Sequence, residues 1–149
     1  MLALRSGICV VLGLVTVSSM AQTRAVSAKE LLENGATVLS ADELRQLAHP
    51  GSMMIHVAPS TGNWRTWTNR VDGTFSIITR VVNASAYTGS SGTGTWVITP
   101  DGRYCAYISW QSEIEKWCRA VWRYKDGLYS APLDLEKAGT TMYGLLEIR

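Results

Sequence analysis

The sequence predicts a mainly β (α+β) domain, in which an antiparallel meander curls into a small barrel or half-barrel with one or two short N-terminal helices. From residue 52 onward the chain is rich in Trp, Tyr, Val, Ile and Thr, the residue types that favour strands. Asp-Gly dipeptides beginning at Asp72, Asp101 and Asp126 separate these segments, and glycine accepts the positive φ of tight hairpin turns. Seven or eight such strands must curl or pack on themselves to bury an apolar face, so a β-sandwich is the alternative.

The first residues have the pattern of a secretory signal peptide. Arg5 provides a positive charge, residues 8–17 form a short apolar run, and small residues precede a predicted cleavage after Ala21. The run is shorter than the roughly 20 apolar residues that span a bilayer, so we expect no membrane span after cleavage. Residues 1–21 are therefore interpreted as a signal peptide, and the mature protein is expected to be periplasmic or secreted.

Two short helices are expected between the signal peptide and the strands. Residues 22–38 form a polar, helix-prone lead, and residues 39–149 are expected to form a single β-rich domain. Ser27 and Ser40 are each followed three residues later by a glutamate, which is the capping-box pattern at a helix start. The second helix is predicted to carry one apolar stripe, formed by Leu44, Leu47 and Ala48.

The predicted strands follow one another along the rest of the chain. Asp-Gly turns join the second to the third, the fourth to the fifth and the sixth to the seventh. They cover residues 53–57, 64–71, 74–82, 95–99, 103–110, 116–124, 128–131 and 142–148.

The cysteines predict a disulfide in an oxidising compartment. Cys9 lies in the predicted signal peptide, which leaves Cys105 and Cys118 as a pair. A disulfide between them would stabilise the domain by about 3 kcal/mol. Two metal-binding thiolates are the alternative, but zinc requires four ligands, and His49 and His56 lie in no ligand motif. We expect a disulfide, with no metal and no cofactor.

A disulfide at these positions also assigns the faces of two strands. Residues directly opposite in an antiparallel pair share a face, so Tyr107 and Trp122 are expected on the face of the disulfide. Arg119 is expected on the other face with Tyr104 and Ile108. Neither face is cleanly polar, which fits strands covered on both sides as well as a sheet with a semi-apolar outer groove.

Candidate catalytic groups form no motif. His56 alternates with apolar residues on its strand and is interpreted as a surface or satisfied histidine. Glu113 and Glu115 lie between Trp110 and Trp117, a combination that glycosidases use. Because the two glutamates are only two residues apart, we interpret them as solvated charges of a hairpin loop. The protein is therefore expected not to be an enzyme.

Two other classes of partner are not supported. Residues 89–94 are rich in Gly and Ser but lack the Lys-Ser/Thr of a phosphate-binding loop, so they are interpreted as a flexible hairpin loop. The formal charge of the whole chain is +2, and its charges are scattered. Arg119 and Arg123 come nearest to a basic cluster and are interpreted as solvated strand-edge residues, so no nucleic-acid partner is expected.

The tryptophans are the remaining functional candidates. Trp64 and Trp67 lie three residues apart, so on a strand they face opposite ways and one is expected to be available for stacking. With Trp110 and Trp117 they are the expected ligand or partner contacts, although a purely structural role for all six tryptophans is the alternative. We hypothesise an exported, non-catalytic β protein that binds a small apolar or sugar-like ligand. A protein-interaction module or hydrolase inhibitor of the cell envelope, using the loops near residues 89–94 and 113–116, is the alternative.

A set of short motifs resembles a known family. They are Gly94-Thr95-Trp96, Asp101-Gly102-Arg103-Tyr104-Cys105, Trp117-Cys118-Arg119 and Asp126-Gly127-Leu128-Tyr129. The chain resembles the bacterial domain of unknown function 995 family over roughly residues 39–129. This resemblance implies an exported, compact β-rich domain with a disulfide, and it transfers no activity or catalytic residue.

Overall fold

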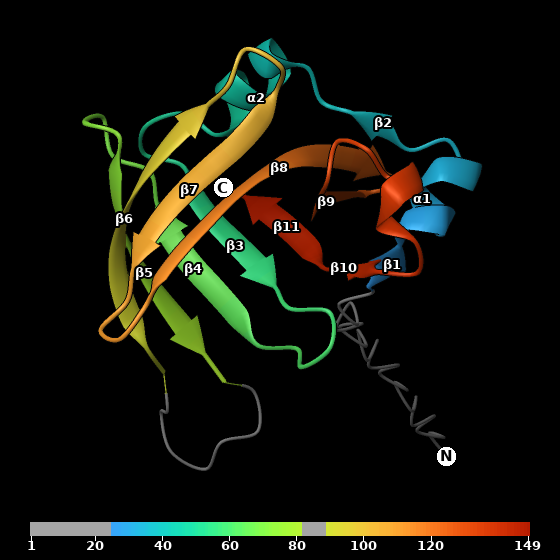
Figure 1. Cartoon of the computed structure of the whole chain (residues 1–149). Helices are drawn as coiled ribbons and strands as arrows, with labels where there is room; N and C mark the ends of the chain where they lie inside the picture. The colour runs from blue at the N-terminus through green and yellow to red at the C-terminus, as the bar shows by residue number, and fades with distance from the viewer. Residues whose placement is uncertain (1–24, 82–88) are drawn as a thin grey trace, which may run out of the picture.

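The protein folds into a closed antiparallel β-barrel of eight strands (Figure 1). The computed structural model describes residues 25–81 and 89–149, so the predicted signal peptide lies outside the described residues. The sheet runs in the order β8-β7-β6-β5-β4-β3-β11-β9, and a second pairing between β9 and β8 closes it. The predicted barrel is confirmed. Within the described ranges, no helix is long and apolar enough to cross a membrane.

Each barrel strand overlaps a strand that the sequence predicts. The strands are β3 (Met53–Val57), β4 (Trp64–Thr68), β5 (Thr74–Arg80), β6 (Ser91–Ile98), β7 (Arg103–Ser109), β8 (Ile114–Tyr124), β9 (Gly127–Ala131) and β11 (Leu145–Ile148).

All three Asp-Gly hairpins form, joining β4 to β5, β6 to β7 and β8 to β9. In the first two, Gly73 and Gly102 have φ of +78°, as the prediction requires. In the third, Lys125 takes the positive φ of 51°, and Gly127 is already the first residue of β9. A Cβ at Gly127 would lie 2.9 Å from Leu145 Cδ1, so a larger residue there would displace that side chain.

Close approach of strands explains two boundaries that the sequence prediction placed wrongly. β6 begins at Ser91 rather than at residue 95, so the glycine-rich segment is mostly strand and not a loop. A Cβ at Gly94 would lie 2.5 Å from Phe75 Cζ, so only glycine leaves room for that ring. The predicted last strand is interrupted at Gly144, which separates β10 (Met142–Tyr143) from β11. A Cβ at Gly144 would overlap Val57 O, so only glycine fits at this break.

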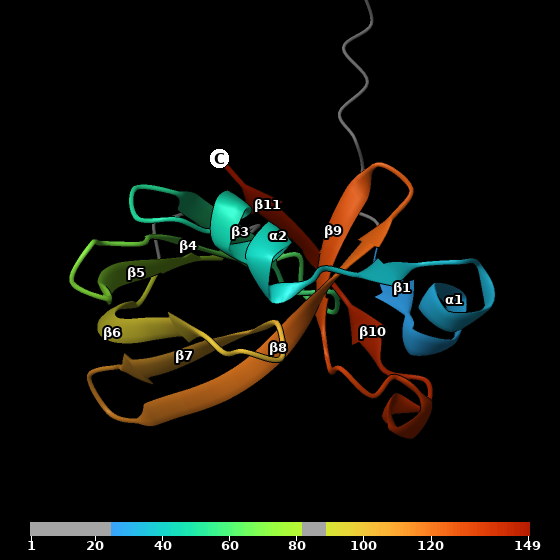
Figure 2. The same ribbon diagram turned by 90° about the horizontal axis from the view of Figure 1, so that it is seen from above.

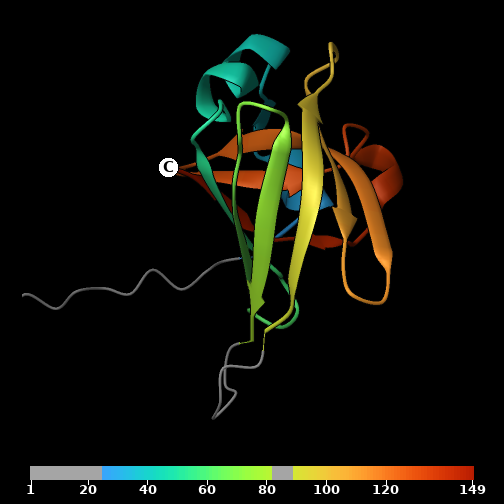
Figure 3. The same ribbon diagram turned by 90° about the vertical axis from the view of Figure 1, so that its left-hand side faces the viewer.

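The helix α2 (Ala41–Leu47) covers one end of the barrel (Figure 3). Its capping box is confirmed, since the Ser40 side chain accepts from Glu43 N and the Glu43 carboxylate accepts from Ser40 N. Leu44 and Ala48 are fully buried against the barrel core. Leu47 is 37% exposed, so the predicted apolar stripe is wrong at this position.

A second, smaller core lies beside the barrel (Figure 2). Ser27 caps α1 (Ala28–Glu33) by accepting from Glu30 N, as its sequence predicts. Around this helix are β1 (Val26–Ser27), β2 (Thr37–Val38), β10 and the 3-10 helix η1 (Glu136–Ala138). The buried residues of this core are Val26, Ala28, Leu31, Tyr124, Tyr129, Ala131, Leu135 and Tyr143.

The disulfide between Cys105 and Cys118 is present, with an S–S distance of 2.11 Å. The two cysteines are direct cross-strand partners on β7 and β8. One position further along, Tyr104 is the partner of Arg119 on the opposite face. The predicted face assignment is therefore confirmed, and the face of Tyr104 and Arg119 is the interior of the barrel.

Candidate functional site

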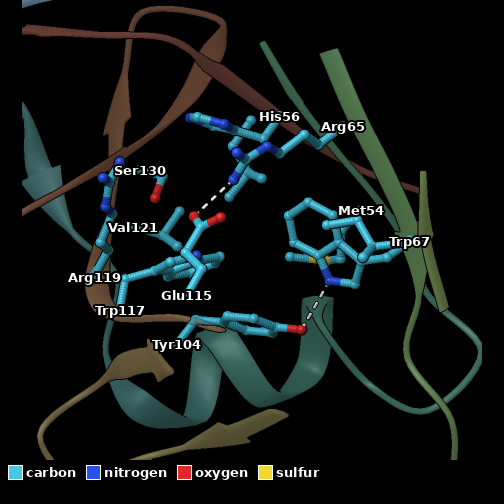
Figure 4. A pocket seen from close by; sticks show the side chains of 12 residues that line it. Met54, His56, Arg65, Trp67, Tyr104, Glu115, Trp117, Arg119, Val121 and Ser130 are labelled. Carbon is cyan, nitrogen blue, oxygen red and sulfur yellow. Dashed lines mark hydrogen bonds and ion pairs between the residues drawn. The ribbon is translucent and has the colours of Figure 1, made fainter. Parts of the chain in front are cut away.

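The barrel interior contains a cavity of about 50 Å³ (Figure 4). It lies beside the apolar layer that α2 covers, and its walls come from strands around the whole barrel. Its lining residues are Met54, His56, Arg65, Trp67, Ile77, Tyr104, Glu115, Trp117, Arg119, Val121, Ser130 and Leu146. Aromatic and aliphatic walls with a few convergent polar groups are typical of small-molecule sites.

An ion pair crosses the cavity from β4 to β8. Arg65 Nη1 donates to Glu115 Oε1 at 2.7 Å, and Trp110 Nε1 donates to Glu115 Oε2 at 3.0 Å. The Arg65 guanidinium also lies over the Trp110 ring, 5.3 Å from the ring centroid. The side chains of Arg65 and Glu115 are 36% and 29% exposed, so solvent reaches this part of the site.

Glu115 is held in its ionised form. Burial opposes ionisation, but hydrogen bonds from Arg65 and Trp110 and the positive charges of Arg65 and Arg119 outweigh it, and the pKa of Glu115 is lowered. Both carboxylate oxygens are occupied by these donors. Glu115 is thus a fixed negative charge with a structural partner rather than a free base.

His56 projects from β3 into the same cavity. Its Nε2 atom is buried and has no hydrogen-bond partner among the described residues. Burial, followed by the positive charges of Arg119 and Arg65, lowers the pKa of His56 to about 4, against the opposing effect of Glu115. The imidazole is therefore neutral near pH 7, with an unused polar atom at the cavity.

Arg119 projects from β8 toward the same region as His56 (Figure 4). Its guanidinium lies 5.8 Å from the centroid of the Trp117 ring. In the part of the chain that the structure describes, this guanidinium forms no ion pair and no hydrogen bond. Arg119 lies on a stretch of β8 that pairs on one side only, as the prediction of a strand-edge residue requires, but its side chain is half-buried and lines the cavity rather than being solvated. Arg123 is exposed, as predicted, and pairs with Glu43.

On the side nearer α2, the polar groups are satisfied. Trp67 Nε1 donates to the Tyr104 hydroxyl at 2.9 Å, and that hydroxyl donates to Asn69 Oδ1 at 2.7 Å. Asn69 in turn donates to the Ala48 carbonyl. Burial raises the pKa of Tyr104, although these hydrogen bonds oppose it, so the hydroxyl stays neutral. This series of hydrogen bonds fixes the wall of the cavity, and its donors are all used within the protein.

The barrel wall is incomplete next to the charged groups. From residue 114 to residue 119, β8 pairs with β7 alone, because β9 pairs with β8 only from Ala120 onward. Within the described part of the chain, the second edge of this stretch of β8 has no strand partner. Glu115, Trp117 and Arg119 all belong to this stretch.

The four predicted contact tryptophans occupy different environments. Trp67 is buried and Trp117 half-buried, and both line the cavity. Trp110 touches the cavity only through Glu115 and Arg65. Trp64 lies on the outer face of β4, 5.0 Å under the Arg80 guanidinium. The expectation that Trp64 and Trp67 face opposite ways is confirmed, but they do not form one site.

Sequence reasoning did not identify the charged members of the cavity. The prediction of a loop at Glu115 is wrong, because β8 begins at Ile114 and places the Glu115 side chain inside the barrel. The alternation around His56 predicts a surface or satisfied histidine, whereas its Nε2 atom is buried at the cavity and has no hydrogen-bond partner among the described residues. The available signal was the face assignment from the disulfide, which put Arg119 among buried apolar neighbours, where an unpaired charge is rare.

No candidate metal site is found among the described residues. Within residues 25–81 and 89–149, no three His, Cys, Asp or Glu side chains lie close enough to hold a metal ion. Comparison with family models, with curated proteins and with solved structures finds no match to this chain. The cavity is therefore the feature of this protein that bears on its function.

Proposed function

We propose that this chain is an exported, non-catalytic binding protein that holds a small ligand in the half-open interior of its barrel. The observation that carries the proposal is the cavity, where aromatic walls meet groups with unused bonding capacity. Barrels of eight strands have an interior that side chains can just fill or that can hold one small ligand. In this barrel, side chains fill the end of the interior that α2 covers, and the rest of the interior contains the cavity.

The arrangement of the polar groups favours binding over catalysis. A histidine acting as a general base is normally oriented by a hydrogen-bonded carboxylate. Glu115 instead receives its hydrogen bonds from Arg65 and Trp110, and His56 Nε2 has no partner among the described residues. The groups are positioned to recognise a ligand, without a nucleophile and base in contact.

Export is supported by the sequence of residues 1–21 and by the disulfide, since disulfides persist in oxidising compartments. We expect the protein recovered from periplasm or medium to begin at Gln22. N-terminal sequencing of the recovered protein tests this, and an intact Met1 in the cell pellet alone would contradict it.

Ligand binding is tested by filling the cavity. Ser130 is buried at the cavity wall, and Ser130→Leu would occupy its space. Ser109→Leu places the same change on the exposed outer face of β7 and is the matched control. Thermal shift and tryptophan fluorescence are measured with neutral and acidic sugars, amino sugars, and small aromatic acids and amides.

At least one compound is expected to raise the melting temperature of the wild type and of Ser109→Leu, while Ser130→Leu gives no response. A panel without any response in the wild type would overturn the proposal. Equal binding by Ser130→Leu would place the ligand outside the barrel and overturn it as well.

A further inference from the structure

The charges around the cavity do not balance. Arg65 and Glu115 neutralise each other at 2.7 Å. His56 is neutral near pH 7, because burial and the two arginines disfavour its charged form. Arg119 is half-buried, lies over the Trp117 ring and is attracted at longer range by Glu115, but Arg65 already neutralises that carboxylate, so the groups lining the cavity keep one net positive charge. Removing a guanidinium from water without a counter-charge is unfavourable, so the site favours a negatively charged group.

The hydrogen-bonding capacity points the same way. A guanidinium carries five N–H donors and no acceptor, so Arg119 can only donate. The buried Nε2 of His56 is unpartnered within the described chain, and in the Nε2–H tautomer of the neutral ring it donates to an acceptor. The hydrogen bond of Tyr104 is already made to Asn69. The unused capacity of the cavity thus fits a ligand rich in acceptor oxygens.

The size and charge of the cavity restrict the ligand further. About 50 Å³ holds a head group or a few water molecules, and not a whole drug-sized molecule. A carboxylate carries a single negative charge and matches the planar fork of an arginine. A phosphate monoester carries about −1.5 to −2 near pH 7 and would leave excess negative charge beside Glu115.

We propose that the cavity recognises the carboxylate of a small organic acid, bound by the Arg119 guanidinium and the His56 ring. The rest of the acid extends along the unpaired edge of β8, past Trp117. This inference rests on the proposed function and names its ligand class.

An acid and its amide have nearly the same shape but differ in charge, so comparing their affinities tests whether the site recognises a carboxylate. Benzoate is compared with benzamide, and glucuronate with glucuronamide, by isothermal titration calorimetry at pH 7 and low salt. Arg119→Gln removes the proposed partner. Arg123→Gln is the matched control, because it makes the same change on the same strand at an exposed position outside the cavity.

A charge-assisted hydrogen bond contributes enough that its loss lowers affinity about 10- to 100-fold. At least one acid is expected to bind the wild type, with its amide at least about tenfold weaker. Arg119→Gln is expected to lose the preference for the acid. Arg123→Gln is expected to bind within about twofold of the wild type, since an exposed charge outside the site chiefly changes the association rate.

NMR of the wild type keeps the test decisive if Arg119→Gln unfolds. The chain contains two histidines, and the exposed His49 is an internal control. The acid is expected to shift the ring resonances of His56 and not those of His49. Acid binding without a response at His56 would overturn the proposed placement.

The remaining outcomes separate the two proposals. If acids and amides bind the wild type equally, or if Arg119→Gln binds acids as the wild type does, the carboxylate inference fails and the binding function stands. If neither these pairs nor the wider panel binds, the binding function itself fails, and the inference fails with it.

Discussion

The two halves of the barrel interior are built differently. Under α2, Leu44, Phe75 and Trp67 pack against one another, and the Trp67–Tyr104–Asn69 chain pairs its polar atoms. In the other half, Arg119 forms no ion pair or hydrogen bond among the described residues, and the buried Nε2 atom of His56 has no hydrogen-bond partner there. In the half under α2 the apolar side chains are packed and the polar atoms are paired, whereas in the other half some polar and charged groups lack hydrogen-bond partners among the described residues. Such departures are expected where binding is the purpose of the site.

The half under α2 is expected to determine stability, and the charged half is the one proposed to bind the ligand. Substitutions under α2 are expected to change the free energy of unfolding strongly. Substitutions among the charged groups are expected to change it little, or to do so in a pH-dependent way.

Phe75→Ala is expected to have the largest effect on stability. The ring is fully buried between Trp67 and Gly94, so its removal creates a cavity and should lower the free energy of unfolding by about 3 to 5 kcal/mol. Urea denaturation measures the change. Val71→Ala, at a position 89% exposed, should change stability by less than about 0.5 kcal/mol. A loss below about 1 kcal/mol for Phe75→Ala would show that this half is not the rigid one.

Removal of the disulfide is expected to cost about 3 kcal/mol, because it closes a loop between residues 13 apart. The Cys105→Ala/Cys118→Ala double variant should also loosen β8 locally, since its residues 114–119 pair with β7 alone. Amide hydrogen exchange should therefore accelerate more in this stretch than in α2. Uniform acceleration along the chain would argue against a specific coupling between the disulfide and the cavity wall.

Acidification is expected to destabilise the protein through His56. Its pKa is about 4 in the folded protein, against an ordinary value of about 6.5, so between these pH values the unfolded chain binds more protons. The stability due to the neutral ring is complete above about pH 6.5 and is lost as the pH falls to about 4. The loss is about 3 kcal/mol at most.

Urea midpoints of the wild type and of His56→Gln, measured from pH 7 to pH 4, isolate this contribution. Carboxylates such as Glu115 titrate in both proteins, so their effect cancels in the difference. The wild type should lose stability relative to His56→Gln as the pH falls from about 6.5 to about 4. Parallel curves across the window would show that His56 is not shielded from solvent.

Glu115→Gln is expected to have the smallest effect on stability. Its ion pair with Arg65 is about one third exposed, and such pairs contribute about 1 kcal/mol or less. Tyr104→Phe is the contrast, because it leaves buried groups of Trp67 and Asn69 unpaired and should cost about 1 to 3 kcal/mol. Thermal unfolding ranks the two variants. The reverse order would remove the distinction between the two halves.

The sequence predicted the barrel because hairpin chemistry is local. Asp72-Gly73 and Asp101-Gly102 determine their turns through the φ that glycine permits. The predicted glycine function failed at Gly127, and the predicted strand ends failed near Gly94 and Gly144. At Gly94 and Gly144, glycine is required by the backbone or ring of a residue distant in sequence, which no local pattern reveals.

The candidate site was less predictable for the same reason. Its charged residues come from three strands, and each alone resembles an ordinary surface residue. The β3–β4 pairing already places His56 beside Arg65, but only barrel closure brings Arg119 of β8 to the same space. The disulfide register correctly placed Arg119 on the face of Tyr104, but without closure that face could not be identified as an interior.

Because of the position of β11 in the sheet, the cavity is expected to form late in folding. Leu146 pairs with His56 on one side and with Leu128 on the other, so β11 joins segments far apart in the chain. Long-range pairings of this kind form slowly, because the entropy of loop closure must be overcome first. The hairpins and the disulfide involve nearby residues and do not depend on β11. Ligand binding would therefore report that the last strand has docked, whereas disulfide formation would not.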